Sequence, residues 1–346
     1  MAGIMEYIQW RGDLPFAQFP LNPVDNLIFS KLSYLQLKNA VGQKGARTLR
    51  ETAQDIFADN TNNALGVLLT GEFKRMLKLM SDSRRYGSLI IRDTLEIYDE
   101  EVEIQFAVTV IELNRDTAYI AFRGTDDTLI GWKEDFKMSF MDEVPAQKIA
   151  VDYVNKAVPR FKYKKIYLGG HSKGGNLAVY AAIHAEKNVK DKIVTVYNND
   201  GPGFRKRLLD TKEYRRVSER IVTLVPQSSV VGMLLEHEES YRVVQSTQHG
   251  LFQHDGFSWQ VLGPDFVYLP RVGDDCITVD RTVKEVLLTL SDEQREAFIN
   301  TFFEILDMNK NRTLTDMKKD GLKTLYSMSR NYHSLDKKTK KAISST

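Results

Sequence analysis

The sequence contains one cysteine, Cys276, among 346 residues. A lone cysteine forms no intrachain disulfide and excludes a zinc site built from several thiolates, so a reducing compartment is favoured. The chain also lacks an uninterrupted apolar run of about 18 residues, and its first residues show no basic segment followed by an apolar stretch. From these absences we expect a soluble, cytoplasmic protein of bacterial type without a transmembrane segment.

Neither sign of charge dominates, because the sequence has 48 Lys and Arg residues and 46 Asp and Glu residues, which gives a net charge of +2. Such a balance provides no dense phosphate-neutralising patch, which argues against a nucleic-acid partner. Short basic runs at residues 205–207 and 337–341 are typical of solvated surface. Hydrophobic residues make up 42% and charged residues 27%, so the composition is that of a globular protein with a buried core, not of a disordered chain.

Apolar residues recur at helical spacing in the first part of the chain. The pattern predicts an early helix within residues 22–40, after Asn22-Pro23, and further helix from about residue 46 to residue 82. Because this block precedes the first strands, we interpret residues 41–82 as a helical insertion and a candidate cap. Its apolar segment ALGVLLTGEFKRMLKLM is a candidate lid, with simple core packing as the alternative.

After residue 82 the hydrophobic pattern becomes that of strands. Three successive strands are predicted at SLIIRDTLEIYD, EIQFAVTVIEL and TAYIAFRGT, which indicates a sheet edge built from hairpins. Beyond a helix predicted over residues 146–160, further strands alternate with helices: KKIYLGGHS, DKIVTVYNND, RIVTLVPQ and YRVVQST. This alternation predicts a mostly parallel α/β sheet with helices on both faces. Residues 280–346 show only amphipathic helical patterns.

The strongest local pattern is Gly170-His171-Ser172-Lys173-Gly174, a G-x-S-x-G sequence that directly follows a predicted strand and precedes an alanine-rich helix. In such an elbow the serine oxygen is exposed near a helix N-terminus, and the amide of the next residue faces the developing oxyanion. Gly170 and Gly174 leave room for the sharp turn. We therefore predict Ser172 as a nucleophile and the Lys173 amide as an oxyanion donor.

A second motif, FRGT at residues 122–125, ends an earlier predicted strand. Together with Trp132, Asp135 and the later GHSKGGNLA, it resembles the class 3 (fungal-type) lipases and their bacterial relatives. The resemblance implies an α/β-hydrolase fold. It also implies that Thr125 supplies a backbone amide, and often its hydroxyl, to the oxyanion hole beside the Lys173 amide.

Two further segments resemble an uncharacterised bacterial lipase-like family: DGPGF at residues 200–204 and QHDGFSW at residues 253–259. The resemblance begins with WRGDL and NPVDNLIFSKLSYL near the N-terminus and extends to about residue 330. With the patterns above, it implies an α/β-hydrolase domain over residues 1–279 and a C-terminal helical extension over residues 280–346. It implies little about the substrate.

The catalytic base is expected after the last core strand, since the usual order in this fold is Ser, acid, His. We predict His254, which lies in the QHD segment, with His249 as the alternative. The remaining histidines are assigned to the variable elbow position, to the following helix or to the surface: His171, His184, His237 and His333.

The acid is harder to place. Class 3 lipases have an aspartate after the strand that corresponds to RIVTLVP, but residues 226–229 here are PQSS and include no carboxylate. Asp200 ends the preceding predicted strand, so its carboxylate is the predicted partner that fixes the His254 tautomer. Glu236 and Asp255 are the alternatives, and a dyad without a carboxylate also stays open.

These residues predict a serine esterase, lipase-like or lysophospholipase-like, which cleaves a carboxylic ester through an acyl-enzyme and requires no metal or organic cofactor. The expected partner is a small-molecule or lipid ester, with a transient membrane or protein contact open and the oligomeric state undetermined. Two alternatives use the same fold: a catalytically silent binding protein, and an acyltransferase or thioesterase with the same nucleophile.

Overall fold

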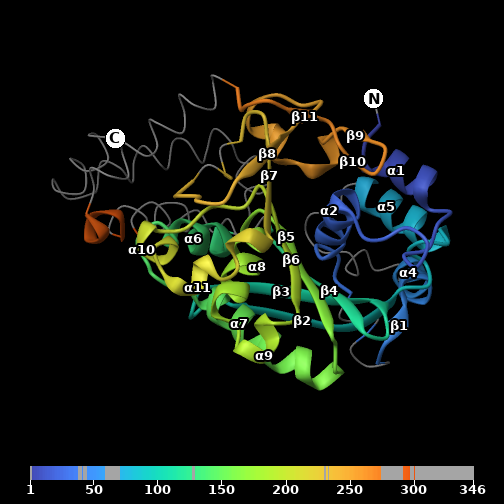
Figure 1. Ribbon diagram of the computed structural model, residues 1–346, viewed down its shortest axis with the longest axis horizontal. Coiled ribbons are helices and arrows are strands. Elements are labelled where there is room, and N and C mark those ends of the chain that lie inside the picture. Colours follow the sequence, from blue (N-terminus) through green and yellow to red (C-terminus); the bar gives the residue numbers. More distant parts are fainter. Residues whose placement is uncertain are drawn as a thin grey trace.

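The computed structural model describes residues 2–37, 41, 45–58, 71–126, 129–229, 231–232, 234–273, 291–296 and 300. Its centre is a nine-stranded sheet in the order β1-β2-β3-β4-β5-β6-β7-β8-β11 (Figure 1). The strands are β1 (Arg47–Thr48), β2 (Ile90–Asp99), β3 (Ile104–Asn114), β4 (Thr117–Phe122), β5 (Lys165–His171), β6 (Ile193–Asn199), β7 (Ile221–Pro226), β8 (Tyr241–Val244) and β11 (Tyr268–Leu269). A separate two-stranded sheet pairs β9 (Val261–Leu262) with β10 (Asp265–Phe266).

Strands β4 to β8 run parallel and form the middle of the large sheet. At one edge β2, β3 and β4 pair as consecutive antiparallel strands, and β1 pairs antiparallel to β2. At the other edge β11 is antiparallel to β8. The hairpin-built edge predicted from the period-two pattern is therefore confirmed.

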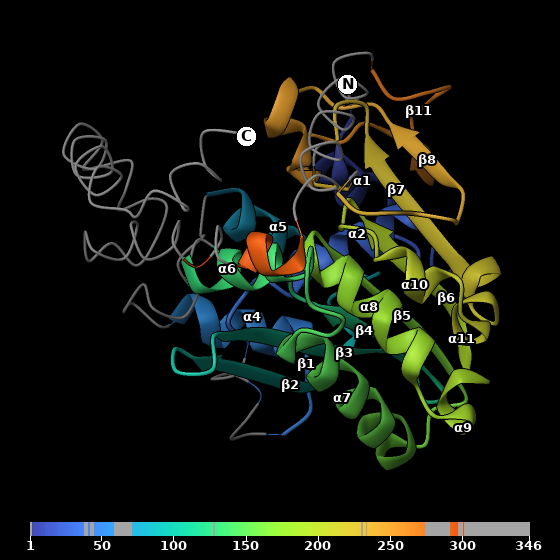
Figure 2. The same cartoon turned by 90° about the vertical axis from the view of Figure 1, so that its left-hand side faces the viewer.

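Helices cover both faces of this sheet (Figures 1 and 2). One face carries α1 (Ile4–Arg11), α2 (Pro23–Leu32), α4 (Leu49–Ala58) and α5 (Gly71–Asp82). The other carries α6 (Leu129–Lys137), α7 (Pro145–Phe161), α8 (Lys173–His184), α9 (Lys187–Lys190), α10 (Lys206–Leu209) and α11 (Lys212–Arg215). With its parallel centre, this is the α/β-hydrolase fold that the sequence predicts.

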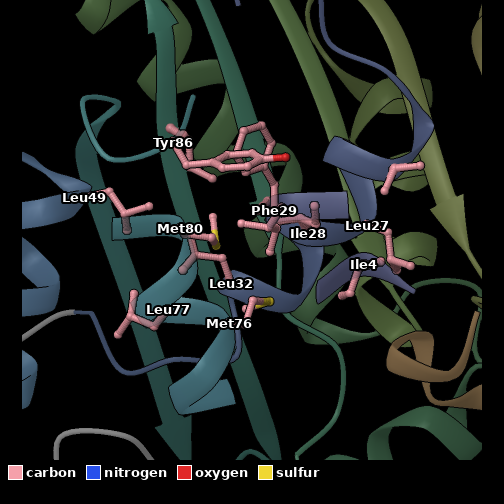
Figure 3. Close-up of a cluster of buried hydrophobic side chains, with 14 of the residues drawn as sticks. Ile4, Leu27, Ile28, Phe29, Leu32, Leu49, Met76, Leu77, Met80 and Tyr86 are labelled. Carbon is pink, nitrogen blue, oxygen red and sulfur yellow. The ribbon is translucent and has the colours of Figure 1, made fainter. Parts of the chain in front are cut away.

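The sheet separates two hydrophobic cores, one on each face. Figure 3 shows the first core, in which side chains of α2 meet those of α1, α4 and α5: Ile4, Leu27, Ile28, Phe29, Leu32, Leu49, Met76, Leu77 and Met80. Burying one side chain of this size stabilises the fold by about 1.5–3 kcal/mol. Helix α2 packs against β5, and its Asn26 donates a hydrogen bond to Oδ1 of Asn199, the last residue of β6, at 2.8 Å.

Helix α2 begins at a capping box. The Asn22 side chain accepts hydrogen bonds from the amides of Val24 and Asp25, and Asp25 in turn accepts from the Asn22 amide. Pro23 occupies the first helical position, where its missing N–H is no loss. The Asp25 carboxylate is also bonded to the wholly buried guanidinium of Arg85, which fixes the start of the helix.

Residues 64–70 of the candidate lid and most of the predicted C-terminal extension lie outside the described residues. The described piece of that extension, residues 291–296, lies beside the α6 and α10 side of the domain. There Arg295 donates to the carbonyl of Ser139 at 2.8 Å, and Arg205 donates to Asp292 at 2.7 Å. In the part of the chain that the structure describes, no helix is both long and apolar enough to cross a bilayer.

Candidate active site

The predicted elbow joins β5 to α8 at Ser172. This residue has a φ of 58° and a ψ of −136°, a backbone conformation that costs about 1–3 kcal/mol for a residue with a side chain. The elbow is held by its own packing: a Cβ atom on Gly170 would lie 2.2 Å from the carbonyl carbon of Gly174, and one on Gly174 would lie 2.2 Å from the carbonyl oxygen of Phe122. Both glycines are therefore required for the close approach of strand and helix.

Asp200 directly follows β6, the strand beside β5, and its side chain is completely buried. His254 is the last residue of a short 3-10 helix, Gly250–His254, from a distant part of the chain. Its Nδ1 donates a hydrogen bond to Oδ2 of Asp200 at 2.6 Å. The bond fixes the proton on Nδ1 and leaves Nε2 of the ring as an acceptor, which is the tautomer a general base needs.

The segment after β7 supplies a hydroxyl in place of the carboxylate that class 3 lipases have there. Ser229 Oγ donates to Oδ1 of Asp200, the oxygen that His254 does not use. A Cβ atom on Gly232 would lie 2.2 Å from the same Oδ1, so the glycine makes room for the carboxylate. The role of Ser229 is not apparent from the sequence, because nothing in PQSS indicates which strand end this serine faces.

The alternative acid and base residues lie elsewhere. Asp255 accepts a hydrogen bond from Nζ of Lys31 at 2.9 Å. Glu236 is exposed and pairs through its backbone with Phe204, while His249 is exposed at the start of the 3-10 helix. Of these candidates, the structure brings together His254 and Asp200.

The end of β4 lies against the elbow, as the FRGT motif predicts. A Cβ atom on Gly124 would lie 2.4 Å from the carbonyl oxygen of His171 and 3.1 Å from Cβ of Ser172. The next residue, Thr125, is hydrogen-bonded through Oγ1 to Oδ2 of Asp135 on α6. Lys173 begins α8, so its amide is among the N–H groups that have no acceptor within the helix.

The side chain of Lys173 has a position that the sequence does not suggest. It is fully buried, and Nζ donates to the Gln105 carbonyl and to Oε2 of Glu134, each at 3.0 Å. Nζ also lies 3.7 Å from Oδ1 of Asp135. Burial is the largest single influence and lowers the pKa of Lys173, but the combined influence of the nearby carboxylates, chiefly Glu134 and Asp135, leaves the pKa raised, so the buried cation is retained.

Asp135 is the titratable group beside Thr125. Burial raises the pKa of Asp135 to about 6, against the lowering effects of Lys173 and of the Thr125 hydroxyl. This carboxyl group therefore changes its charge in a mildly acidic range, next to the predicted oxyanion residue.

Two further histidines are predicted from the sequence to lie at the surface. His237, predicted at the surface, is buried: its side chain is 7% exposed and Nδ1 lies 2.9 Å from Oε1 of Glu239. The prediction is wrong because the segment containing His237 folds back over Gly203, where the ring lies 3.0 Å from the position of an added Cβ. His333 lies outside the described residues.

The Mbeg1-like family model matches residues 80–304 of the chain. No curated protein matches the sequence. Among solved structures, the Rhizomucor miehei lipase in its propeptide complex is 15% identical, with 70% of this chain and 79% of that chain covered and a TM-score of 0.42. A lipase from Rhizopus microsporus var. chinensis is 14% identical, with 70% and 78% covered and a TM-score of 0.39.

Proposed function

The chain belongs to the Mbeg1-like family, and we propose that it is a serine hydrolase that cleaves a carboxylic ester. The observation that carries the proposal is the 2.6 Å hydrogen bond from His254 to the buried carboxylate of Asp200, beside a serine held in a strained strand-to-helix elbow. A nucleophile, an oriented base and a buried acid are the parts that acyl transfer requires.

In the proposed reaction Ser172 Oγ attacks the ester carbonyl carbon while His254 Nε2 accepts the serine proton. The tetrahedral intermediate collapses, the C–O bond to the alcohol breaks, and the imidazolium returns the proton to the leaving alkoxide. Water then attacks the acyl-enzyme with His254 again as base, which releases the acid and restores Ser172. Asp200 stays ionised and stabilises the imidazolium in both steps.

The oxyanion of each tetrahedral intermediate is assigned to the backbone amides of Thr125 and Lys173. Both residues border Ser172: Lys173 is the next residue of the chain, and Gly124, before Thr125, lies against the elbow. Removing one donor of such a hole typically slows acyl transfer by about 100- to 1,000-fold. The substrate proposed for this site is a lipid ester or a smaller carboxylic ester, and the same acyl-enzyme would serve an acceptor other than water.

The alternative of a catalytically silent binding protein depends on the absence, after β7, of the aspartate found in class 3 lipases. Here Asp200, after β6, accepts the hydrogen bond from His254, and Ser229, after β7, donates to the same carboxylate. The missing aspartate is therefore no argument for a silent binding protein. We therefore favour the enzyme.

Hydrolysis of p-nitrophenyl esters of graded chain length tests the proposal. Wild type should turn over, and Ser172→Ala should lose turnover by at least about 1,000-fold. The matched control is Ser88→Ala, at an exposed serine remote from the elbow sequence, which should retain the wild-type rate. A correctly folded wild type that hydrolyses none of the esters would contradict the proposal.

A further inference from the structure

His171, the variable residue of the elbow, directly precedes the proposed nucleophile and packs against the ring of the proposed base. Its side chain is buried, with the residue 4% exposed. Nε2 lies 2.7 Å from the backbone carbonyl oxygen of His254. Since a carbonyl oxygen only accepts, Nε2 carries the proton and donates it.

The other ring nitrogen of His171 also has a partner. The Tyr34 hydroxyl lies 3.0 Å from Nδ1 and donates to it, because Nδ1 has no proton in this tautomer. Tyr34 follows α2, the helix fixed by the first hydrophobic core, so the ring is held from the N-terminal part of the chain. One donor and one acceptor satisfy a neutral imidazole completely.

The two imidazole rings are also packed on each other. The ring centroids of His171 and His254 are 4.6 Å apart with an interplanar angle of 36°. The backbone of His171 is fixed in turn, since it pairs with Asn199 in the parallel sheet and the next amide, of Ser172, donates to Asn199 at 2.9 Å. His171 therefore joins a rigid strand end to both the ring and the backbone of His254.

The charges around His171 favour its neutral form. Burial, together with the nearby Lys31 ammonium and His254, holds the pKa of His171 well below its usual range. Nζ of Lys31 donates a hydrogen bond to Oδ1 of Asp255, the residue after His254, at 2.9 Å, which holds the ammonium group in place. A protonated His171 would lose its acceptor for Tyr34 and would place a cation against the ring that must itself become cationic during acyl transfer.

We propose that His171 is a positioning residue, which sets the place of the His254 ring relative to Ser172 through its Nε2–H bond to the His254 carbonyl. The inference rests on the proposed function of Ser172 and His254 and adds a role to a residue of the elbow. The bond matters because His254 lies on a short, part-exposed 3-10 helix, whereas Ser172 is fixed by the sheet.

The test compares His171→Leu, which removes both ring nitrogens, with His171→Gln, whose side-chain N–H reaches toward the position of Nε2. His171→Leu should lower kcat by about 10- to 100-fold and change KM by about twofold or less, because a misplaced base slows the chemistry without altering binding. His171→Gln should recover most of the lost rate. Tyr34→Phe, which leaves the Nε2 donor in place, should lose only about two- to fivefold. His184→Leu, at an exposed histidine on α8, is the matched control and should keep the wild-type rate.

A second readout needs no turnover. In ring-nitrogen NMR spectra of the full chain, His171 should stay neutral with its proton on Nε2 at the pH where an unperturbed imidazole is half protonated, because its pKa is lowered by burial and by the nearby cations. The downfield proton of the His254 Nδ1 bond to Asp200 should appear in wild type and His171→Gln and broaden in His171→Leu.

Wild-type kcat and an unchanged His254 resonance in His171→Leu would overturn the inference. So would equal losses in His171→Leu and His171→Gln that follow a drop in Tm, since these indicate a purely structural residue. If wild type hydrolyses no ester but the His254 resonance still depends on His171, the proposed function fails and the positioning contact stands.

Discussion

Asp200 and Ser229 lie just beyond the carboxyl ends of the neighbouring parallel strands β6 and β7, and the Ser229 hydroxyl donates a hydrogen bond to Oδ1 of Asp200. The second carboxylate oxygen, Oδ2, accepts the proton of His254 Nδ1 at 2.6 Å. Each carboxylate oxygen therefore has its own partner. The bond from Ser229 fixes the plane of the carboxylate, and the carboxylate in turn orients the His254 ring. A buried carboxylate held in this way orients an imidazole without a second acid nearby.

Ser229→Ala should lower kcat/KM by about 10-fold, because the loss of one hydrogen bond to a buried carboxylate weakens its hold on His254. Steady-state hydrolysis and the rate of labelling by a fluorophosphonate measure the effect. Ser218→Ala, at a serine whose hydroxyl donates to the Arg215 carbonyl at 3.2 Å, is the matched control. Equal rates in wild type and Ser229→Ala would show that Asp200 needs no support from β7.

Asp200→Asn separates Asp200 from Asp255 as the acid. An Asn amide at residue 200 favours the wrong His254 tautomer, so turnover should fall by about 10,000-fold. Asp255→Asn removes the partner of Lys31 but leaves the Asp200 bond, and turnover should fall by about fivefold or less. Parallel measurements of kcat/KM decide between them, and a larger loss in Asp255→Asn would reverse the assignment.

Lys173→Met should destabilise the fold by about 3–5 kcal/mol, because it leaves the buried carboxylate of Glu134 without its cation. Unfolding by urea measures the free energy of unfolding. The double variant Lys173→Met/Glu134→Gln should recover part of the loss, and Lys187→Met, at an exposed lysine, is the control. A loss below about 1 kcal/mol in Lys173→Met would contradict a charged cluster beneath the elbow.

The raised pKa of Asp135 should make the free energy of unfolding decrease as the pH rises. Its pKa is about 6 in the folded chain, with burial as the main cause. An unfolded aspartate has a pKa of about 3.9, so the protonated group stabilises the fold below that value and the contribution is lost as the pH rises through the folded-state pKa. The difference of about two pKa units corresponds to about 3 kcal/mol.

Between about pH 4 and about pH 7, the free energy of unfolding of Asp135→Asn should therefore rise relative to wild type by up to about 3 kcal/mol. Urea unfolding across this range measures it. Asp116→Asn, at a side chain 51% exposed, should follow wild type throughout. Parallel curves for wild type and Asp135→Asn would show that this carboxyl group is not perturbed.

The sequence was sufficient to predict the elbow and the strands around it. The elbow is a contiguous motif, and the strands and helices follow from the hydrophobic period. The change of period places the elbow between β5 and α8. The class 3 resemblance implies the role of Thr125, and Asp200 ends a predicted strand. Both residues lie at one edge of the sheet, where the carboxyl ends of adjacent parallel strands meet.

The supporting side chains were not predictable in the same way. A lysine is almost always expected in solvent, and only the packing of β3 and α6 provides the acceptors that bury Lys173. Lys173 directly precedes the mostly apolar run GGNLAVYAAI, and that run is the signal in the sequence that the start of α8 is buried. The roles of His171 and Ser229 depend on loops that are remote in sequence, so no spacing rule connects them to His254 or Asp200.

Mapping the site of covalent labelling by a fluorophosphonate tests the central claim most directly. Peptide mass spectrometry of the labelled full chain should place the adduct on Ser172, and Ser172→Ala should remain unlabelled while Ser88→Ala is labelled at the wild-type rate. His254→Ala should retain Ser172 but react far more slowly, since its hydroxyl has lost the base. A folded wild type that stays unlabelled, or an adduct on another serine that persists in Ser172→Ala, would contradict the assignment of Ser172 as the nucleophile.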